Sequence, residues 1–421
     1  MTAPSGAAKN NRKNGDVVNQ LTENKTVAKG MLMVFFALAS FQNLSILSLN
    51  SIALKPVHVF SLLFLPLLLM NKEVRINKAV TVFTLFVLAV SLWNYAHFGF
   101  DGKLTYYVFG LFVVVIFQNC GKKLTYDDWL DAACGAAAFV MLIVILNDIK
   151  WKGSFITFFS QPQKSHPYFP TVMSHLNLES TWLGTFAFAF YKKGPWKWVY
   201  ACLNMGIALL YGSRCGMIVG AMAILWLFIQ DLPKLNTRRN RIILAVILVV
   251  GAVVAVRSGM YEAFIGRALR RFLSKGSEIG DAARLQIWQY AGLTIRSYPL
   301  GCGAGNGIKA LIEASGVPTG EENWCNVYLQ AFVEFGWVGG ALYLYLVCRM
   351  FWNGRKELLS NPFLAALSSY CVVALFQFRG GETIAFFLLA FYLATRKPES
   401  AGKNDPDLVV RNPFLRKKGE V

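Results

Sequence analysis

The sequence predicts an all-α polytopic membrane protein with about twelve transmembrane helices and a helical loop subdomain between spans nine and ten. Three observations predict this fold class. The chain is 55% hydrophobic and only 15% charged. Several apolar runs reach the ~20 residues that a helix needs to cross a bilayer. The basic residues gather in the short segments between these runs.

Twelve apolar segments are expected to form the transmembrane helices. They lie near residues 30–49, 55–71, 79–98, 104–119, 128–148, 174–191, 196–211, 214–230, 241–257, 326–348, 362–378 and 380–395. A long polar segment follows the ninth. The chain therefore divides into a disordered cytoplasmic tail (1–29), spans one to nine (30–257), a loop subdomain (258–325), spans ten to twelve (326–395) and a second tail (396–421).

The distribution of basic residues predicts the topology. Most of the 42 Lys and Arg fall in the two tails and in alternate short loops, which places all of these on one face. That face is cytoplasmic by the positive-inside rule. Both termini are then cytoplasmic, and membrane topology explains the basic excess without a nucleic-acid partner. The first 30 residues lack the apolar core of a cleavable signal peptide.

The loop subdomain is expected to contain two helices and a tight turn. Phe264, Ala268 and Phe272 are spaced as on one face of an amphipathic helix over 261–273. A second helix is expected over 281–296, stopped by Pro299. The following segment, 301–307, has alternate glycines, which favours positive φ angles in a turn. It lacks the G-x-G-x-x-G spacing of a dinucleotide site.

Three arginines on the opposite, outer face are candidate binding residues. Arg214 and Arg379 lie at span ends and Arg284 lies in the loop subdomain. An arginine at a span end commonly extends its charge to the lipid headgroups. The alternative is a site for a diphosphate, because a guanidinium group pairs bidentately with phosphate oxygens at any pH.

Other polar residues suggest further sites. Glu179, Glu334 and Glu382 lie within or beside apolar spans, where an ionisable group is often functional. The four histidines are too scattered to predict a metal site. Cys302 and Cys325 both lie in the outer segment, where they could form a disulfide or remain free thiols.

A combination of these features resembles a known family. Arg284 on a loop helix, the glycine turn after Pro299, and Asn326 followed by Gly336 and Gly339 are similar to motifs of the O-antigen ligase and polymerase superfamily. The resemblance covers roughly residues 170–345. It implies a bacterial inner-membrane glycosyltransferase with about a dozen spans and a periplasmic active site. Such an enzyme is GT-C-like and independent of metals and cofactors.

The resemblance also implies roles for individual residues. Arg214 and Arg284 match family arginines that would bind a diphosphate, Asn326 belongs to the ligase motif, and Arg379 is a further substrate-binding candidate. The family places a histidine, the expected base, where this chain has Cys325. A Cys325 thiolate, Glu321 or Glu322 could replace that base, or the base could be lost.

The expected reaction is transfer of a polysaccharide from undecaprenyl diphosphate to lipid A–core, within the membrane lipids, by an O-antigen ligase. A polymerase that extends the same lipid-linked glycan is the alternative within the superfamily. A twelve-span secondary transporter is a third hypothesis, but transporters often have related halves, and no such repeat is visible in the sequence.

Overall fold

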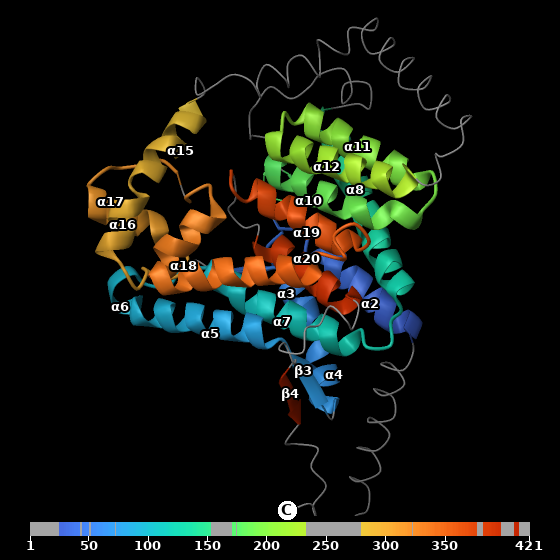
Figure 1. Cartoon of the computed structure of the whole chain (residues 1–421), viewed down its shortest axis with the longest axis horizontal. Coiled ribbons are helices and arrows are strands. Elements are labelled where there is room, and N and C mark those ends of the chain that lie inside the picture. The colour runs from blue at the N-terminus through green and yellow to red at the C-terminus, as the bar shows by residue number, and fades with distance from the viewer. Residues whose placement is uncertain are drawn as a thin grey trace, which may run out of the picture.

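The computed structural model describes residues 25–42, 44–49, 52–71, 73–152, 171–173, 175–232, 279–321, 323–376, 382–396 and 408–411, and these are mostly helical. The helices before the loop subdomain are α2 (Lys25–Leu38), α3 (Pro56–Ser61), α4 (Phe64–Met70), α5 (Lys78–Trp93), α6 (Tyr95–Phe98), α7 (Leu104–Cys120), α8 (Tyr126–Lys152), α10 (Leu176–Ala187), the 3-10 helix η1 (Phe188–Lys192), α11 (Trp196–Leu210) and α12 (Arg214–Asp231). Those that follow are α15 (Ile279–Gln289), α16 (Ala291–Ser297), α17 (Gly307–Ser315), α18 (Val327–Gly354), α19 (Pro362–Val373) and α20 (Glu382–Thr395). Figure 1 shows their arrangement.

Helices therefore occupy most of the expected spans, with the ninth (241–257) and the expected helix over 261–273 outside the described residues. Three described helices are long and apolar enough to cross a membrane, and several others are apolar but shorter. The spanning helices are Tyr126–Lys150, Arg214–Asp231 and Val327–Gly354. The structure thus supports an apolar helical protein, while the count of twelve spans remains a prediction.

Two expected spans differ from continuous helices. The span expected over 30–49 ends as a helix at Leu38, and a short hairpin of β1 (Leu47–Leu49) and β2 (Ile52–Leu54) follows. The span expected over 55–71 is broken between α3 and α4. Pro66 accounts for that break, because a helical proline lacks an N–H and collides with the carbonyl four residues earlier, here that of Leu62.

The core between the apolar helices is rich in aromatic rings. Phe36 of α2 lies 4.2 Å from Phe186 of α10 and 5.3 Å from Phe391 of α20, measured between ring centroids. Phe391 in turn stacks on Phe363 of α19 at 4.6 Å. Phe36, Phe186, Phe363 and Phe391 are all at most 1% exposed. These large apolar surfaces hold the early and late parts of the chain together.

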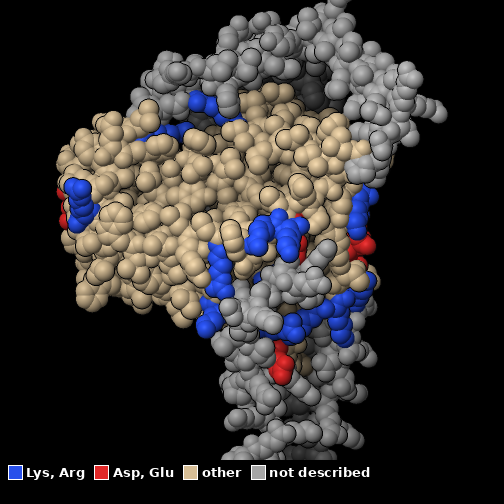
Figure 2. Space-filling view, viewed as in Figure 1, with Lys and Arg blue, Asp and Glu red and all other residues tan. Residues whose placement is uncertain are grey.

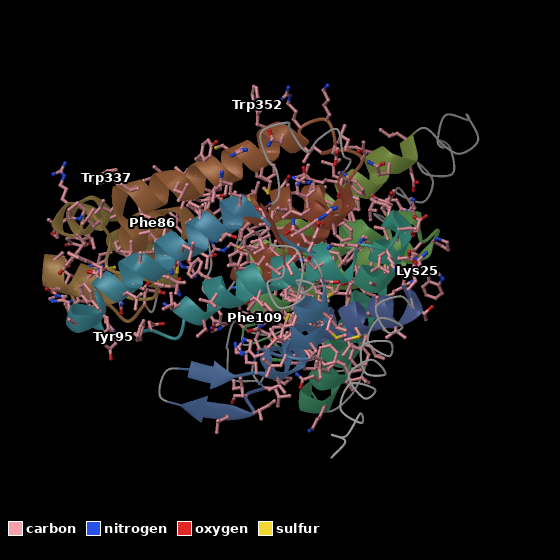
Figure 3. The ribbon with its side chains drawn as sticks, turned by 90° about the horizontal axis from the view of Figure 1, so that it is seen from below. Lys25, Phe86, Tyr95, Phe109, Trp337 and Trp352 are labelled. Atoms are coloured by element: carbon pink, nitrogen blue, oxygen red, sulfur yellow. The ribbon has the colours of Figure 1, made fainter. Side chains whose placement is uncertain are left out.

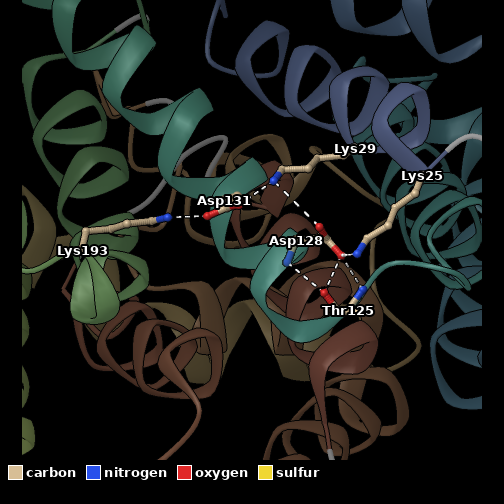
Figure 4. Close-up of polar contacts among 6 residues, drawn as sticks. All are labelled: Lys25, Lys29, Thr125, Asp128, Asp131 and Lys193. Carbon is tan, nitrogen blue, oxygen red and sulfur yellow. Dashed lines mark hydrogen bonds and ion pairs between the residues drawn. The ribbon is translucent and has the colours of Figure 1, made fainter.

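A cluster of ion pairs joins the polar ends of several helices (Figure 4). Lys25 and Lys29 of α2 contact Asp128 and Asp131 of α8 at 2.7 and 2.5 Å. Lys193, after η1, also pairs with Asp131. All these residues lie at helix ends that the sequence assigns to the cytoplasmic face. A single exposed ion pair stabilises a protein little. The Asp131 carboxylate, however, links α8 to both α2 and the segment after η1.

A second small sheet connects two segments expected on that same face. β3 (Glu73–Ile76) pairs with β4 (Leu408–Arg411) in an antiparallel register that sets Glu73 opposite Arg411. The Asn119 side chain accepts from the Arg75 backbone N–H at 2.8 Å and donates to its carbonyl at 2.7 Å. The pairing requires the C-terminal strand and the 73–76 loop to share a side, as in the predicted topology.

The surface shows the pattern of a membrane protein. Figure 2 shows a broad face without charged side chains, with most of its visible Lys and Arg gathered at one edge. Trp337, just after the kink of α18, and Trp352, near the end of that helix, are 53% and 69% exposed (Figure 3). Fifteen residues of helix separate them by about 22 Å, which is less than the ~30 Å thickness of the hydrocarbon part of a bilayer.

The described part of the loop subdomain consists of α15, α16 and α17, packed against the start of α18 (Figure 1). The helix expected over 281–296 is present as α15 and α16, interrupted at Tyr290, and it ends at Ser297 before Pro299 as predicted. Trp324 and Cys302, both 0% exposed, lie in the small core between these helices.

The glycine turn packs directly against a kink in α18. Gly301, Gly303 and Gly305 have φ angles of 89°, 86° and 81°, which confirms the predicted turn. Gly336 interrupts α18 with a φ of 67°. The Trp337 N–H donates to the Pro299 carbonyl at 3.1 Å. A Cβ on Gly336 would lie 2.3 Å from that oxygen. The positive φ and this close approach both exclude a side chain at Gly336.

This geometry makes a prediction about stability. Gly336→Ala should lower the free energy of unfolding by at least about 2 kcal/mol more than Gly99→Ala, measured by thermal unfolding in detergent with tryptophan fluorescence. Gly99 is a matched control because its φ of 75° and ψ of −176° are close to the 67° and −171° of Gly336, but a Cβ there would meet nothing within 4 Å. Equal losses in the two variants would show that the close approach to Pro299 contributes nothing.

Candidate functional site

The N-terminal end of α12 carries Arg214 and is held by α10. Gly212 turns the chain with a φ of 60°, and Ser213 caps α12 by accepting from the Gly216 N–H at 3.1 Å. The Ser180 hydroxyl of α10 donates to the Ser213 hydroxyl at 2.8 Å. Arg214 is therefore the first residue of a capped helix whose start is fixed, and its guanidinium group projects from a defined position.

A buried group of acids lies directly behind this turn. The Tyr211 hydroxyl contacts a carboxylate oxygen of Asp148 at 2.6 Å and one of Glu179 at 2.7 Å. Asp148 and Glu179 are both 0% exposed. Since a tyrosine hydroxyl carries one proton, two full hydrogen bonds require a second proton on one of the carboxyl groups. The trio ties α8, α10 and the end of α11 together just before Arg214.

Arg284 on α15 approaches the same place from the loop subdomain. The Arg214 and Arg284 guanidinium groups both interact electrostatically with the thiol of Cys215, which is buried at the start of α12. Trp288, one turn further along α15, donates its indole N–H to the Trp324 carbonyl at 2.7 Å. That bond anchors α15 beside the segment that enters α18. The two arginines thus both act on one residue although they are 70 positions apart in the sequence.

Cys325 lies at the entry to α18 with an unusual backbone conformation. Its φ of 50° is the one positive value outside glycine in the described part of the chain. The Asn323 side chain accepts from the Cys325 N–H at 2.9 Å. Asn326 then caps α18 by accepting from the Leu329 N–H at 3.0 Å. Such strain in a non-glycine residue is concentrated at functional sites, where the surroundings fix a side chain in place.

The Cys325 thiol contacts one basic and one acidic side chain. Burial raises the pKa of Cys325 to about 11, although Arg284, which also hydrogen-bonds the thiol, lowers it in part. The nearby Glu321 raises it, with the thiol donating to Oε2 at 3.7 Å. At pH 7 only about one such thiol in ten thousand is ionised. The thiol is therefore a hydrogen-bond donor under neutral conditions.

The possible disulfide between the two outer cysteines is absent. Cys302 and Cys325 are both free thiols. The Cys302 thiol is directed to the Val333 carbonyl of α18 at 3.5 Å, and it is completely buried. Cys302 therefore fills the core of the loop subdomain, and Cys325 belongs to the polar cluster with Arg284 and Glu321.

The other candidate residues lie either outside the described part of the chain or within helices α18 and α20. Glu322 and Arg379 lie outside the described residues. Glu334 is buried in α18, where it accepts from the Gln330 amide at 2.8 Å, and Glu382 begins α20. Where residues are described, no three His, Cys, Asp or Glu side chains are grouped as a metal site.

The sequence predicts Arg214, Arg284, Glu321, Cys325 and Asn326 as site residues, and it does not predict that Tyr211 and Asp148 lie behind Arg214. Tyr211 and Asp148 carried a weak signal, because Tyr211 precedes the Gly-Ser-Arg turn and Asp148 interrupts the end of an apolar run. The role of Asn326 is clear only in the structure, where its side-chain oxygen caps α18.

The glycines of the ligase-type motif have a packing role. Gly336 forms the α18 kink described above. A Cβ on Gly339, three residues later, would lie 2.6 Å from the Phe86 ring of α5. Figure 3 shows Phe86 beside α18. Asn326, Gly336 and Gly339 thus provide a helix cap, a kink and a close contact with α5 in the first half of α18.

Comparison with known proteins agrees with the motif evidence. Residues 199–344, about a third of the chain, match the family model described as O-antigen ligase. No curated protein matches the chain. The matched region contains Arg214, Arg284, Cys325 and the motif glycines, and its family consists of glycosyltransferase-like enzymes of O-antigen assembly. The match therefore supports the assignment of this protein to the O-antigen ligase and polymerase superfamily, as the motifs around Arg284 and Asn326 predicted.

Proposed function

We propose that this protein is an O-antigen ligase that transfers a polysaccharide from undecaprenyl diphosphate to lipid A–core at the periplasmic face of the inner membrane. The observation that carries the proposal is the convergence of Arg214 and Arg284 on Cys215, beside the Cys325–Glu321 contact. Transfer of a sugar from a diphosphate to a hydroxyl needs cations to stabilise the leaving diphosphate and a base to accept the hydroxyl proton. Two arginines and a hydrogen-bonded carboxylate can meet these needs.

The arginines are proposed to stabilise the departing diphosphate. As the bond between the sugar and the diphosphate breaks, negative charge increases on the phosphate oxygens. A guanidinium group remains charged at any pH and offers two parallel N–H donors to such oxygens. Arg214 and Arg284 come from elements held by separate contacts, so each can be positioned before the substrate binds. The roles of Arg379 in binding and of Asn326 in contacting substrate remain predictions.

The acceptor hydroxyl must lose a proton, and Glu321 is the described carboxylate in contact with Cys325. A thiol with a pKa of about 11 is a poor proton acceptor near neutral pH. Glu321 is held beside it by the thiol contact at 3.7 Å. We therefore propose that Glu321 accepts the proton, with Glu322 as the neighbouring candidate, and that Cys325 replaces the family histidine without its basic function.

A polymerase would use the same donor and the same leaving group, so the described site suits both enzymes. The spacing from Asn326 to Gly336 and Gly339 is of the ligase type, which favours the ligase. The acceptor separates the two functions: lipid A–core for a ligase and a second lipid-linked glycan for a polymerase.

Deletion of the gene tests the proposal, with total lipopolysaccharide separated on a gel. For a ligase we expect core-only lipopolysaccharide and accumulation of lipid-linked polysaccharide, because transfer to lipid A–core is the step lost. Core bearing a single repeat unit would instead identify a polymerase. An unchanged pattern would contradict both functions.

Substitution of the arginines should reduce transfer and leave folding intact. Arg284→Ala and Arg214→Ala should each lower the transfer rate by roughly 30- to 1,000-fold, measured with purified lipid-linked donor. Arg284→Lys should recover little, because an ammonium group cannot form the bidentate contact. The exposed Arg296 of α16 provides a control on the same subdomain. Full activity in Arg284→Ala would remove this residue from the site.

The identity of the proton acceptor can be tested by three variants and a pH profile. Glu321→Gln should lose about 10²- to 10⁴-fold in rate, Cys325→Ala should stay active, and Cys325→His should be faster than the parent, since histidine titrates near neutral pH. The parent rate should be nearly flat from pH 7 to 9. A thiolate base would instead raise the rate about tenfold per pH unit toward pH 11. That slope, or an inactive Cys325→Ala protein, would assign the base to Cys325.

A further inference from the structure

A long apolar groove runs along α18 from Val327, which is close in sequence to Cys325, to Asn353. It encloses about 1270 Å³ of space, part of which is open to the surroundings. Its walls come from α5, α7, α18, α19 and α20, which Figure 1 shows side by side. Most lining residues are apolar or aromatic, such as Phe83, Tyr343, Leu346 and Leu389. Such walls suit a hydrocarbon chain.

Charge in this groove is confined to one end and has one sign. Of the described residues that line it, Arg349 of α18 and Arg396, directly after α20, are charged, and none of those described is Asp or Glu. Asn77 and Asn353 lie at the same end. Arg349 also donates to the Tyr345 hydroxyl at 3.3 Å. Arg349 from α18 and Arg396 from the end of α20 thus provide a cationic end to an apolar groove.

This cationic end is remote from the arginines of the proposed active site. Arg349 follows Asn326 by 23 residues, which corresponds to about 35 Å along a helix. The hydrocarbon part of a bilayer is about 30 Å thick. Arg349 and Arg396 also fall in segments that the basic-residue pattern assigns to the cytoplasmic face. An anion held there is therefore a different group from a diphosphate held by Arg214 and Arg284.

We propose that the groove binds an anionic phospholipid of the cytoplasmic leaflet. Its phosphate would lie between Arg349 and Arg396, and an acyl chain would follow the apolar walls past Leu346. Basic pockets between membrane helices on the cytoplasmic side commonly hold anionic headgroups. Through its phosphate, the bound lipid would link Arg349 near the end of α18 to Arg396 at the end of α20.

The test measures lipid bound to the purified full-length protein in a non-ionic detergent. The protein is incubated with phosphatidylglycerol or with zwitterionic phosphatidylcholine, and bound lipid is counted by native mass spectrometry. We expect preferential binding of phosphatidylglycerol. Arg349→Gln and Arg396→Gln should each weaken it about 5-fold, and the double variant about 25-fold. Arg355→Gln is the matched control, because Arg355 is an exposed arginine nearby that stacks on Trp352 at 4.5 Å outside the groove.

Two further measurements distinguish a phospholipid in the groove from a polyprenyl chain. Ala385→Leu, which narrows the groove, should reduce phosphatidylglycerol binding without lowering the melting temperature.

Undecaprenyl phosphate is added as a competitor, to ask whether the groove holds the polyprenyl chain instead. The proposal is overturned if both phospholipids bind alike, or if Arg355→Gln weakens binding as much as the groove variants. It is also overturned if undecaprenyl phosphate displaces phosphatidylglycerol and binds the double variant unchanged.

Discussion

The backbone contact between the glycine turn and the kink of α18 determines where the loop subdomain lies. Gly301 and Gly336 both have positive φ angles, and a Cβ on either would fall within 2.4 Å of the opposite backbone. Gly303 also donates its N–H to the Glu334 carbonyl at 2.8 Å. Because no side chain separates the two segments, α15 and α16 are held at a fixed distance from the start of α18. The meeting of Arg284 and Cys325 depends on that distance.

The N-terminal ends of α12 and α18 are built in the same way. Each begins with a capping side chain, Ser213 or Asn326, that satisfies an N–H of the first turn. Each also has the proposed functional residue beside the cap, Arg214 after one and Cys325 before the other. A capped helix start fixes the neighbouring backbone, and its exposed N–H groups favour negative charge. Both features suit a site for an anionic leaving group.

The sequence predicted most helices because long apolar runs leave few other structures possible in a membrane. It also predicted the stop at Pro299 and the positive φ angles of the glycine turn, which are local properties. It did not predict the break at Leu62 or the pairing of β3 with β4, which joins segments more than 300 residues apart. Glu179 was a candidate, but its grouping with Tyr211 and Asp148 was not predicted for the same reason: the acids come from α8 and α10, and only packing brings them to one hydroxyl.

Replacement of the expected histidine by Cys325 changes the charge balance of the site. A histidine there would gain and lose charge near neutral pH, whereas a thiol with a pKa of about 11 stays neutral. The charged groups that act on this thiol are then the Arg284 guanidinium group and the Glu321 carboxylate. Arginine does not lose its proton in proteins, so the proposed binding of a diphosphate by Arg214 and Arg284 does not depend on their titration. In the proposed function, Glu321 accepts the proton and the two arginines bind the donor, so these two tasks depend on different side chains.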